Sequence, residues 1–518
     1  MQYPKIILYS LLLIVFTTCR STEGPATTPS PWPYGTMYEI FVQSYADSNG
    51  DGIGDINGLT AKLDYLQGLG IDGIWLMPVN PSPSYHKYDV TDYYGIHPDY
   101  GTMDDFKAFV AAAHQRNINV VIDLVLNHTS SEHPWFKAAT QDKNSKYRHY
   151  YVWANIDSIR DQIAKKEVTL DSDNITQWHQ AAGSNSPDEY YYGFFWGGMP
   201  DLNYDNPDVR QEVINIGKFW LTEVGVDGFR LDAAKHIFPD ERAADSHAWW
   251  REFGDAMRAV KPDVYMVGEV WGDAGLVGPY LQGLPSMFNF DFHHGINRIL
   301  KNEQDDGLIE DLLAARETYR QIQPHYLDAI FVNNHDQNRL LDNVEGNLPK
   351  ANLATAILLT LPGVPYIYYG DEIGMFGHKP DPNIREPFIW DYDARAPEQT
   401  HWLEAVNSTD KTVVPLAAQI NDPGSTYSFY RYWISLRNEL ATLRTGNLQP
   451  IDLPAYLLGY ARVGENERLV VVHNLTGEEQ RLDVGPLNIS RIQHRFAPEI
   501  SLAGGWLKLP PYASVILQ

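Results

Sequence analysis

The chain has 518 residues, enough for two or three domains and at least one large hydrophobic core. Its formal net charge of −26 at pH 7 argues against nucleic acid or an anionic membrane surface as a partner, because phosphate groups would be repelled. Aromatic residues make up 13% of the chain, and although most belong in the core, such rings also stack on flat, weakly polar ligands such as sugars. Composition therefore favours a neutral polymer or a cation as the binding partner.

The N-terminus has the pattern of an export signal. Lys5 precedes an apolar run over residues 6–16, which has the length of a signal-peptide core and is too short to span a bilayer. Cys19 is the only cysteine, so no internal disulfide can form, and it is placed like the lipid-attachment cysteine of a bacterial lipoprotein. A chance cysteine in a conventional signal peptide is the alternative. We expect a signal peptide over 1–18, a flexible Ser/Thr/Pro-rich tether over 19–35, and a protein held in the periplasm or at the cell surface, or otherwise secreted.

Beyond the tether, short apolar runs typical of buried strands alternate with amphipathic stretches typical of helices. The predicted strands are Met37–Tyr45, Ile71–Val79, Ile118–Leu126, Val226–Ala233, Val264–Trp271, Met287–Phe292, Ala329–Asn334 and Val364–Tyr369. The predicted helices are Leu59–Leu69, Met103–Arg116, Val209–Val224, Trp249–Val260, Leu308–Arg320, Ala351–Leu361 and Tyr427–Leu440. This alternation predicts an α/β fold, a parallel (β/α)8 TIM barrel made of residues 36–127 and 200–445.

Two segments depart from the alternation. Residues 128–199 are polar, aromatic and irregular, which predicts a subdomain inserted after the third strand. After Leu440 the pattern changes to short alternating strands, such as Leu469–His473 and Ala513–Leu517. This change predicts a separate C-terminal antiparallel β-sandwich over residues 446–518.

Charged and polar residues gather where the predicted strands end, and in a parallel barrel the C-terminal ends of the strands carry the active site. These residues are Asp123, Asn127, His128, Arg230, Asp232, Glu269, His335 and Asp336. An isolated Arg-x-Asp pair such as Arg230 and Asp232 would more often be a structural ion pair. Its convergence with carboxylates from other strand ends instead predicts a catalytic site.

Two of these carboxylates are sufficient to cleave a glycosidic bond with retention, at a separation of roughly 5 to 5.5 Å, one as nucleophile and one as general acid. Arg230 would share a strand face with Asp232 and keep it ionised, which favours Asp232 as the nucleophile. Glu269 follows an apolar run and lies beside Trp271, where desolvation would raise its pKa and keep it protonated as the acid. The remaining side chains would bind hydroxyl groups of the same sugar ring: Asp336, His128 and His335.

These motifs resemble those of the α-amylase family of retaining α-glucan-active enzymes, and the resemblance covers nearly all of the mature chain. The motifs are residues 123–128 (DLVLNH), 228–236 (GFRLDAAKH), 268–271 (GEVW) and 333–336 (NNHD). The resemblance implies Asp232 as nucleophile, Glu269 as acid/base and Asp336 as transition-state stabiliser. It also implies sugar-binding roles for Tyr88, which would stack on the sugar at the cleavage point, and for His86, Asp381 and Arg385. Residues 199–203 (MPDLN) resemble members intermediate between oligo-1,6-glucosidases and neopullulanases, which include several lipoprotein α-amylases.

A second motif has the pattern of a calcium-binding loop. Residues 47–55 (DSNGDGIGD) place the side-chain oxygens of Asp47, Asn49, Asp51 and Asp55 and the carbonyl of Ile53 at the usual ligand positions. Counted from Asp47, position 12 is Gly58, where an EF-hand has a glutamate that binds the ion with both oxygens, so the loop is not an EF-hand. A polar turn without metal is the alternative. The resemblance implies Ca²⁺ here, after the first strand. In some relatives it implies another Ca²⁺ between barrel and insertion, with ligands that match Asn127, Asp201 and the carbonyl of His236.

The residues after the predicted nucleophile bear on the bond that is cleaved. Ala233 matches the members that cleave α-1,4 bonds, and Lys235 and His236 match residues that hold the aglycone sugar. The resemblance therefore implies endo-hydrolysis of starch-like α-1,4-glucans and maltooligosaccharides by an enzyme that we expect to be a monomer. The alternatives are a 4-α-glucanotransferase, an α-glucosidase or neopullulanase-type activity and, more remotely, a non-catalytic glucan-binding protein.

Overall fold

The computed structural model describes residues 32–163, 176–181, 188–393 and 395–518, so the predicted signal peptide, Cys19 and most of the tether lie outside the described residues. The predicted barrel is confirmed: eight parallel strands close in the order β1-β11-β10-β9-β8-β7-β3-β2. The strands are β1 (Met37–Ile40), β2 (Gly73–Leu76), β3 (Asn119–Leu124), β7 (Gly228–Leu231), β8 (Tyr265–Gly268), β9 (Ser286–Phe288), β10 (Leu327–Phe331) and β11 (Val364–Tyr368). Nearly all their residues are buried, as expected for strands covered on both faces.

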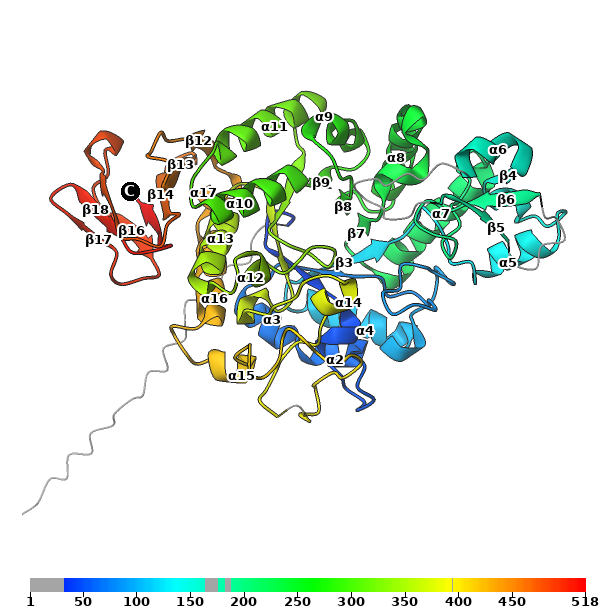
Figure 1. Ribbon diagram of the computed structural model, residues 1–518, viewed down its shortest axis with the longest axis horizontal. Helices are drawn as coiled ribbons and strands as arrows, with labels where there is room; N and C mark the ends of the chain where they lie inside the picture. The colour runs from blue at the N-terminus through cyan, green and yellow to red at the C-terminus, as the bar shows by residue number, and fades with distance from the viewer. Residues whose placement is uncertain (1–31, 164–175, 182–187, 394) are drawn as a thin grey trace, which may run out of the picture.

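Helices surround the barrel (Figure 1). They include α2 (Ile56–Ala61), α3 (Leu63–Leu69), α4 (Met103–His114), α7 (Pro207–Phe219), α8 (Ala243–Arg258), α10 (Phe290–Asn302), α11 (Leu308–Ile322), α13 (Leu348–Thr360) and α16 (Thr426–Glu439). Several begin at a side chain that accepts a backbone N–H bond, such as Thr102 before α4 and Ser425 before α16. These caps fix where each strand-to-helix connection ends, and the polar site residues lie in those connections.

All eight barrel strands are shorter than predicted, and in two cases a helix occupies the rest of the predicted range. The strand predicted over Met37–Tyr45 ends at Ile40 and is followed by the short helix α1 (Val42–Tyr45), whose residues are all buried. The strand predicted over Met287–Phe292 ends at Phe288, because the Asn289 side chain accepts the N–H of Phe292 and starts α10. In both places an apolar run continues across a change of backbone conformation, so hydrophobicity alone placed the boundary wrongly.

The segment between β3 and β7, which was predicted to form an inserted subdomain, contains regular secondary structure although its sequence pattern is irregular. Helices α5 (Pro134–Gln141) and α6 (Ile156–Ile163) accompany an antiparallel sheet in the order β4-β6-β5. Its strands, β4 (Trp153–Asn155), β5 (Trp178–Gln180) and β6 (Glu189–Tyr192), have only three or four residues, too few to produce a clear alternating pattern. An aromatic cluster holds the subdomain together, with the Phe136 ring 4.9 Å from Tyr151 and 4.8 Å from Tyr191.

The C-terminal β domain is also confirmed. One antiparallel sheet has the order β12-β13-β14-β19-β16 and a smaller one the order β15-β18-β17. The strands are β12 (Asn447–Pro450), β13 (Leu457–Val463), β14 (Arg468–Asn474), β15 (Gln480–Asp483), β16 (Ile492–Arg495), β17 (Ser501–Ala503), β18 (Trp506–Leu509) and β19 (Ser514–Leu517). Side chains from both sheets form a separate apolar core that includes Leu457, Val472 and Leu507. Figure 1 shows this domain on the side of the barrel opposite the insertion.

Among the helices of the described ranges, none combines the length and the apolar character that a membrane crossing would need.

Candidate active site

A cavity of about 670 Å³ lies at the C-terminal ends of the barrel strands. Predicted site residues that line it are His86, Tyr88, His128, Asp232, Lys235, His236, Glu269, Asp336, Asp381 and Arg385. They follow four barrel strands, β3, β7, β8 and β10, or lie in the long connections after β2 and β11. Arg230 and His335, also predicted to bind the ligand, are almost fully buried and contact the lining carboxylates instead.

Several lining residues were not predicted from the sequence. They are Phe195, Trp196, Met199, Gln337 and Lys379. Trp196 leaves 51% of its surface exposed, a high fraction for so large an apolar side chain. For Phe195 and Trp196 the sequence signal is the aromatic and glycine-rich run 194–198 (FFWGG) within the insertion. The insertion therefore supplies an apolar wall to a cavity whose floor is charged.

Arg230 is the charged centre of that floor. Its Nη1 donates to Asp123 Oδ1 at 3.0 Å and to the carboxylate of Asp232, and its Nη2 lies 2.8 Å from Glu269 Oε2. The guanidinium is 1% exposed and lies 5.3 Å from the centre of the Trp75 ring. A buried guanidinium is stable only when carboxylates compensate its charge, so this one cation fixes three carboxylates from β3, β7 and β8 relative to each other.

His335 and Tyr88 form a second group beside this centre. The Tyr88 hydroxyl donates to Asp123 Oδ2 at 2.9 Å and lies 2.6 Å from His335 Nε2. The two rings stack with their centres 5.6 Å apart at 13°. The same Nε2 lies 3.1 Å from Asp336 Oδ2. Polar contacts through the Tyr88 hydroxyl and the His335 ring thus connect Asp123, a partner of Arg230, with Asp336.

Asp336 is held by cations on two sides. Besides His335, the Nη2 of Arg385 donates to Asp336 Oδ1 at 2.8 Å. The same Nη2 donates to Asp381 Oδ2 at 3.2 Å, and Nε of Arg385 donates to the carbonyl of His335 at 3.0 Å. The predicted pair of Asp381 and Arg385 therefore lies at the cavity, where Arg385 also orients Asp336.

The surroundings shift the pKa values of Glu269 and Asp336 in opposite directions. Burial raises the pKa of Glu269, Arg230 opposes this shift, and the neighbouring charges of Asp232 and Asp336 raise the pKa further. For Asp336 burial also acts to raise the pKa, but His335 and Arg385 outweigh it and hold the pKa well below its usual range. Glu269 is therefore suited to carry a proton at a pH where Asp336 is ionised.

The pKa of Asp232 requires a correction. Arg230 was expected to dominate the surroundings of Asp232 and to keep this carboxylate ionised, but burial has the larger influence and raises the pKa of Asp232 above its usual value. Arg230 opposes this shift by charge and by a direct hydrogen bond. The guanidinium therefore limits a rise caused by burial, and its removal would let the pKa of Asp232 rise further.

Two histidines at the cavity are neutral near pH 7. Burial lowers the pKa of both His86 and His128 to about 4. His128 Nε2 lies 3.1 Å from the carbonyl of Tyr88, and His86 Nδ1 accepts the N–H of Tyr88 at 3.1 Å. These contacts position Tyr88, and as neutral rings both can offer hydrogen bonds to an uncharged ligand.

The stretch after Asp232 lies along the insertion. The His236 ring stacks on Phe194 with the centres 3.9 Å apart at 25°, and Lys235 Nζ lies 3.4 Å from Asp240 Oδ2. Ala233 has a positive φ of 47° and its N–H donates to Glu269 Oε2 at 3.3 Å. A positive φ is rarely adopted by β-branched residues, so a small side chain suits this position.

The loop predicted to bind Ca²⁺ winds around its own acidic side chains. Asp47 Oδ1 accepts the N–H groups of Asn49 and Gly50 at 2.8 and 2.7 Å, and Asp47 Oδ2 accepts that of Gly52. Asn49 and Asp51 each accept an N–H two residues further on. Carboxylate and amide oxygens that accept N–H bonds in such turns keep further lone pairs. Calcium prefers ligands of these types, so the side chains of the loop fit a calcium ion.

Asp55, the last predicted ligand of the loop, also accepts three hydrogen bonds. Its Oδ1 accepts from the Ser48 hydroxyl at 2.8 Å and from the Gly58 N–H at 2.7 Å, and its Oδ2 accepts from the Ser48 N–H. Asp55 therefore caps α2 and closes the loop.

The structure also brings together two of the ligands expected for a second cation. Asp201 pairs with His128 in an isolated bridge next to Asn127. The Asp201 carboxylate accepts the Phe194 N–H at 3.2 Å, and burial raises its pKa to about 8. Oδ1 of Asn127 is buried without a hydrogen-bond partner. A buried carboxylate beside an unpaired amide oxygen fits a cation, although no cluster of three or more His, Cys, Asp or Glu side chains suited to a metal occurs among the described residues.

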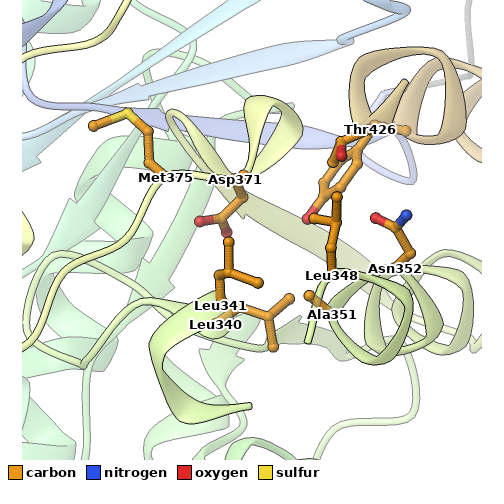
Figure 2. Close-up of a pocket in the computed structure, with 10 residues that line it drawn as sticks. Leu340, Leu341, Leu348, Ala351, Asn352, Asp371, Met375 and Thr426 are labelled. Carbon is orange, nitrogen blue, oxygen red and sulfur yellow. The ribbon is translucent and has the colours of Figure 1, made fainter. Parts of the chain in front are cut away.

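A second cavity, shown in Figure 2, is too small to bind a sugar. It lies against α12 (Leu340–Asn343) and α13, is lined mostly by apolar side chains such as Leu341 and Leu348, and measures about 10 Å³. Oδ2 of Asp371 is buried there without a partner. A volume of this size holds about one water molecule. This cavity is therefore not a candidate active site.

Comparison with known protein families assigns most of the chain. Residues 39–446 match the profile described as "Alpha amylase, catalytic domain", and residues 457–516 match that of the "Alpha-amylase SusG C-terminal domain". The chain is 46% identical to "Alpha-amylase 3" of Dictyoglomus thermophilum, over 99% of this chain and 98% of the relative. It is 36% identical to a "4-alpha-glucanotransferase" of Thermotoga maritima, over 85% of this chain and 96% of the relative.

A solved structure agrees with these sequence matches. The crystal structure of an alpha-amylase from H. orenii superposes with a TM-score of 0.86 at 43% identity, and covers 93% of this chain and 99% of its own. The similarity therefore extends over the barrel, the insertion and the C-terminal β domain together.

Proposed function

Because the chain belongs to the α-amylase family, a family of glycoside hydrolases, we propose that its cavity cleaves internal α-1,4-glucosidic bonds of starch-like glucans and maltooligosaccharides with retention. One observation carries this proposal: Arg230 holds the carboxylates of Asp232 and Glu269 in the floor of one cavity, which Asp336 also lines. Two carboxyl groups at one anomeric centre are what the retaining mechanism needs.

In the proposed reaction Asp232 attacks the anomeric carbon while the bond to the leaving oxygen breaks, and Glu269 gives its proton to that oxygen. The product of this step is a glycosyl ester on Asp232. Glu269, now ionised, then takes a proton from water, and the resulting hydroxide attacks the same carbon and releases Asp232. The raised pKa of Glu269 suits the first step, and Arg230 stabilises the Asp232 carboxylate each time it is formed.

Asp336 is proposed to stabilise the positive charge that develops on the sugar ring in the transition state. It is ionised and held in place by His335 and Arg385, so it needs no reorganisation as that charge appears. Tyr88 would stack on the ring, and His86, His128 and Asp381 would bind its hydroxyl groups. All four line the cavity with Asp336.

The insertion side of the cavity is proposed to hold the leaving, or aglycone, sugars. His236 and Lys235 lie there with the exposed ring of Trp196 and with Phe195. If a sugar hydroxyl bound at these residues replaces water in the second step, the reaction becomes transfer. The relative described as a 4-alpha-glucanotransferase makes transfer the second candidate function.

The nucleophile is tested by Asp232→Asn. We expect release of reducing ends from soluble starch to fall by about 10³-fold or more, because an amide cannot form the glycosyl ester. Asp393→Asn, the same change at an exposed position, should retain wild-type activity. Starch hydrolysis by Asp232→Asn at a near wild-type rate would contradict the mechanism.

Products from maltotriose measured on the wild-type enzyme separate the two functions, since transfer gives longer oligomers and hydrolysis gives shorter ones.

The pH dependence of kcat/KM tests the role of Arg230. Arg230 lowers the pKa of both Asp232 and Glu269, so its removal should raise both values. The acid limb reports ionisation of the nucleophile and the basic limb reports loss of the acid's proton. The whole bell-shaped profile of Arg230→Gln should therefore shift to higher pH, with lower activity throughout. Arg230→Lys, which keeps the charge, should shift less, and an unchanged or downward-shifted profile in Arg230→Gln would refute this role.

We also propose that the chain binds Ca²⁺ at the loop formed by residues 47–55, through Asp47, Asn49, Asp51, Asp55 and the carbonyl of Ile53. A second, weaker expectation places Ca²⁺ at Asn127, Asp201 and the carbonyl of His236. Fixed at such positions, the cation would stabilise the loop after β1 and the junction between barrel and insertion. It would take no part in bond cleavage.

Calcium binding is measured by titration calorimetry on chelator-treated protein, with the melting temperature as a second readout. We expect added Ca²⁺ to raise the melting temperature of the wild type, and Asp51→Ala to remove one binding event. Asp201→Ala serves as the matched change at the other position and should leave binding at the loop intact. No heat of binding and no thermal shift in the wild type would contradict both sites.

Export, attachment through a lipid on Cys19 and a monomeric state are proposals that rest on the sequence. A conventional signal peptide would release the protein, whereas lipidation would retain it in the membrane fraction. Cells that express the full chain should incorporate labelled palmitate into it, and Cys19→Ser should abolish this labelling and move activity to the soluble fraction. Absence of label in the wild type would favour secretion.

A further inference from the structure

Glu39 is a buried carboxylate that the reaction described above does not use. It lies in β1, opposite Trp75 of β2 and Tyr368 of β11, and is 1% exposed. Its Oε1 lies 2.5 Å from Nδ1 of His335, a residue that follows β10. A carboxylate in the barrel interior is costly unless it is paired, so this contact explains how Glu39 is accommodated there.

His335 is fixed at both ring nitrogens and on its faces. Nδ1 meets Glu39, and Nε2 lies 2.6 Å from the Tyr88 hydroxyl and 3.1 Å from Asp336 Oδ2. Tyr88 stacks on one face of the ring, and the Trp75 ring lies at 78° to the imidazole with the two ring centres 5.4 Å apart. The imidazole therefore connects a carboxylate deep in the barrel with one at the cavity.

The two carboxylates determine the charge of this ring. A neutral imidazole has one N–H, so a proton on Nδ1 facing Glu39 would leave a lone pair on Nε2 facing Asp336. A doubly protonated ring instead directs one N–H at Glu39 and the other at Asp336. Burial lowers the pKa of His335, but Asp336 and Glu39 outweigh burial and raise it to about 10. His335 is thus a cation at neutral pH.

We propose that Glu39 is a positioning residue for the reaction: it holds His335 as an oriented imidazolium, and through that cation it fixes Asp336 and the Tyr88 hydroxyl. Glu39 does not line the cavity, so it acts through His335 and does not contact the sugar. This inference rests on the proposed function, because it assigns Glu39 a part in the work of Asp336. It predicts that the negative charge of Glu39 matters more than its shape.

The chain offers a matched control for the loss of a buried carboxylate. Glu372, in the turn after β11, is 0% exposed and accepts hydrogen bonds from the hydroxyls of Tyr38 at 2.5 Å and Tyr65 at 2.6 Å. Neither tyrosine lines the cavity. Glu39→Gln and Glu372→Gln therefore make the same substitution at two buried positions, and only the first touches His335.

The experiment compares these variants on maltooligosaccharides of defined length, with kcat and KM measured separately, together with the melting temperature and the ¹⁵N signals of labelled histidines. For Glu39→Gln we expect kcat/KM to fall about 10- to 100-fold, mostly through kcat, because Asp336 acts on the transition state. The His335 signal should change from that of a doubly protonated ring at pH 7 to that of a neutral ring. Glu372→Gln should keep the wild-type kcat and His335 signal, even if its melting temperature falls.

Each other outcome overturns the inference. Wild-type kcat in Glu39→Gln would show that the charge is not needed. Equal losses in both variants, in parallel with their melting temperatures, would make Glu39 a residue of the fold only. A loss of kcat with the imidazolium signal retained would refute the route through His335.

Failure of this inference is distinguishable from failure of the proposed function. If Asp232→Asn is inactive and Glu39→Gln is fully active, only the role of Glu39 is wrong, whereas an active Asp232→Asn would remove the mechanism on which that role depends. Binding of maltoheptaose, measured by calorimetry in an Asp232→Asn background, shows whether Glu39→Gln retains a folded cavity. The inference expects binding to change less than kcat.

Discussion

The arrangement of the site depends on the burial of Arg230 against three carboxylates. Removing a guanidinium from water carries a penalty of several kcal/mol, which close ion pairs with carboxylates offset. Asp123, Asp232 and Glu269 come from three neighbouring strands, and one planar cation reaches all of them. The same ion pairs that make the cation tolerable inside the barrel therefore set the relative positions of the proposed nucleophile and acid.

Positively and negatively charged side chains alternate along a chain of contacts from Arg230 to Arg385. Arg230 contacts Asp123, whose carboxylate accepts from Tyr88, and Tyr88 adjoins the imidazolium of His335. His335 in turn contacts Asp336, which Arg385 holds from the other side. Such a network directs fixed charges at the sugar before it binds, and preorganised groups of this kind stabilise a transition state without further rearrangement.

The sequence was sufficient to predict the barrel and most of the site, because apolar strand runs locate the strand ends and the charged residues follow them. Glu39 was not found in this way, since it lies within a strand and its partner His335 is distant in sequence. The short strands of the insertion and the wall residue Trp196 lacked a periodic signal. The upward shift of the pKa of Asp232 could not be predicted, because a sequence shows the adjacent cation but not the extent of burial.

The central claim is that Asp232 becomes covalently bonded to the sugar during the reaction. A fluorinated maltosyl fluoride slows the second step more than the first, so the glycosyl ester accumulates and can be located by mass spectrometry of peptides. Our account predicts one added glycosyl group on the peptide that contains Asp232, and on no other carboxylate. A label on Glu269 or Asp336, or inactivation without any covalent adduct, would contradict it.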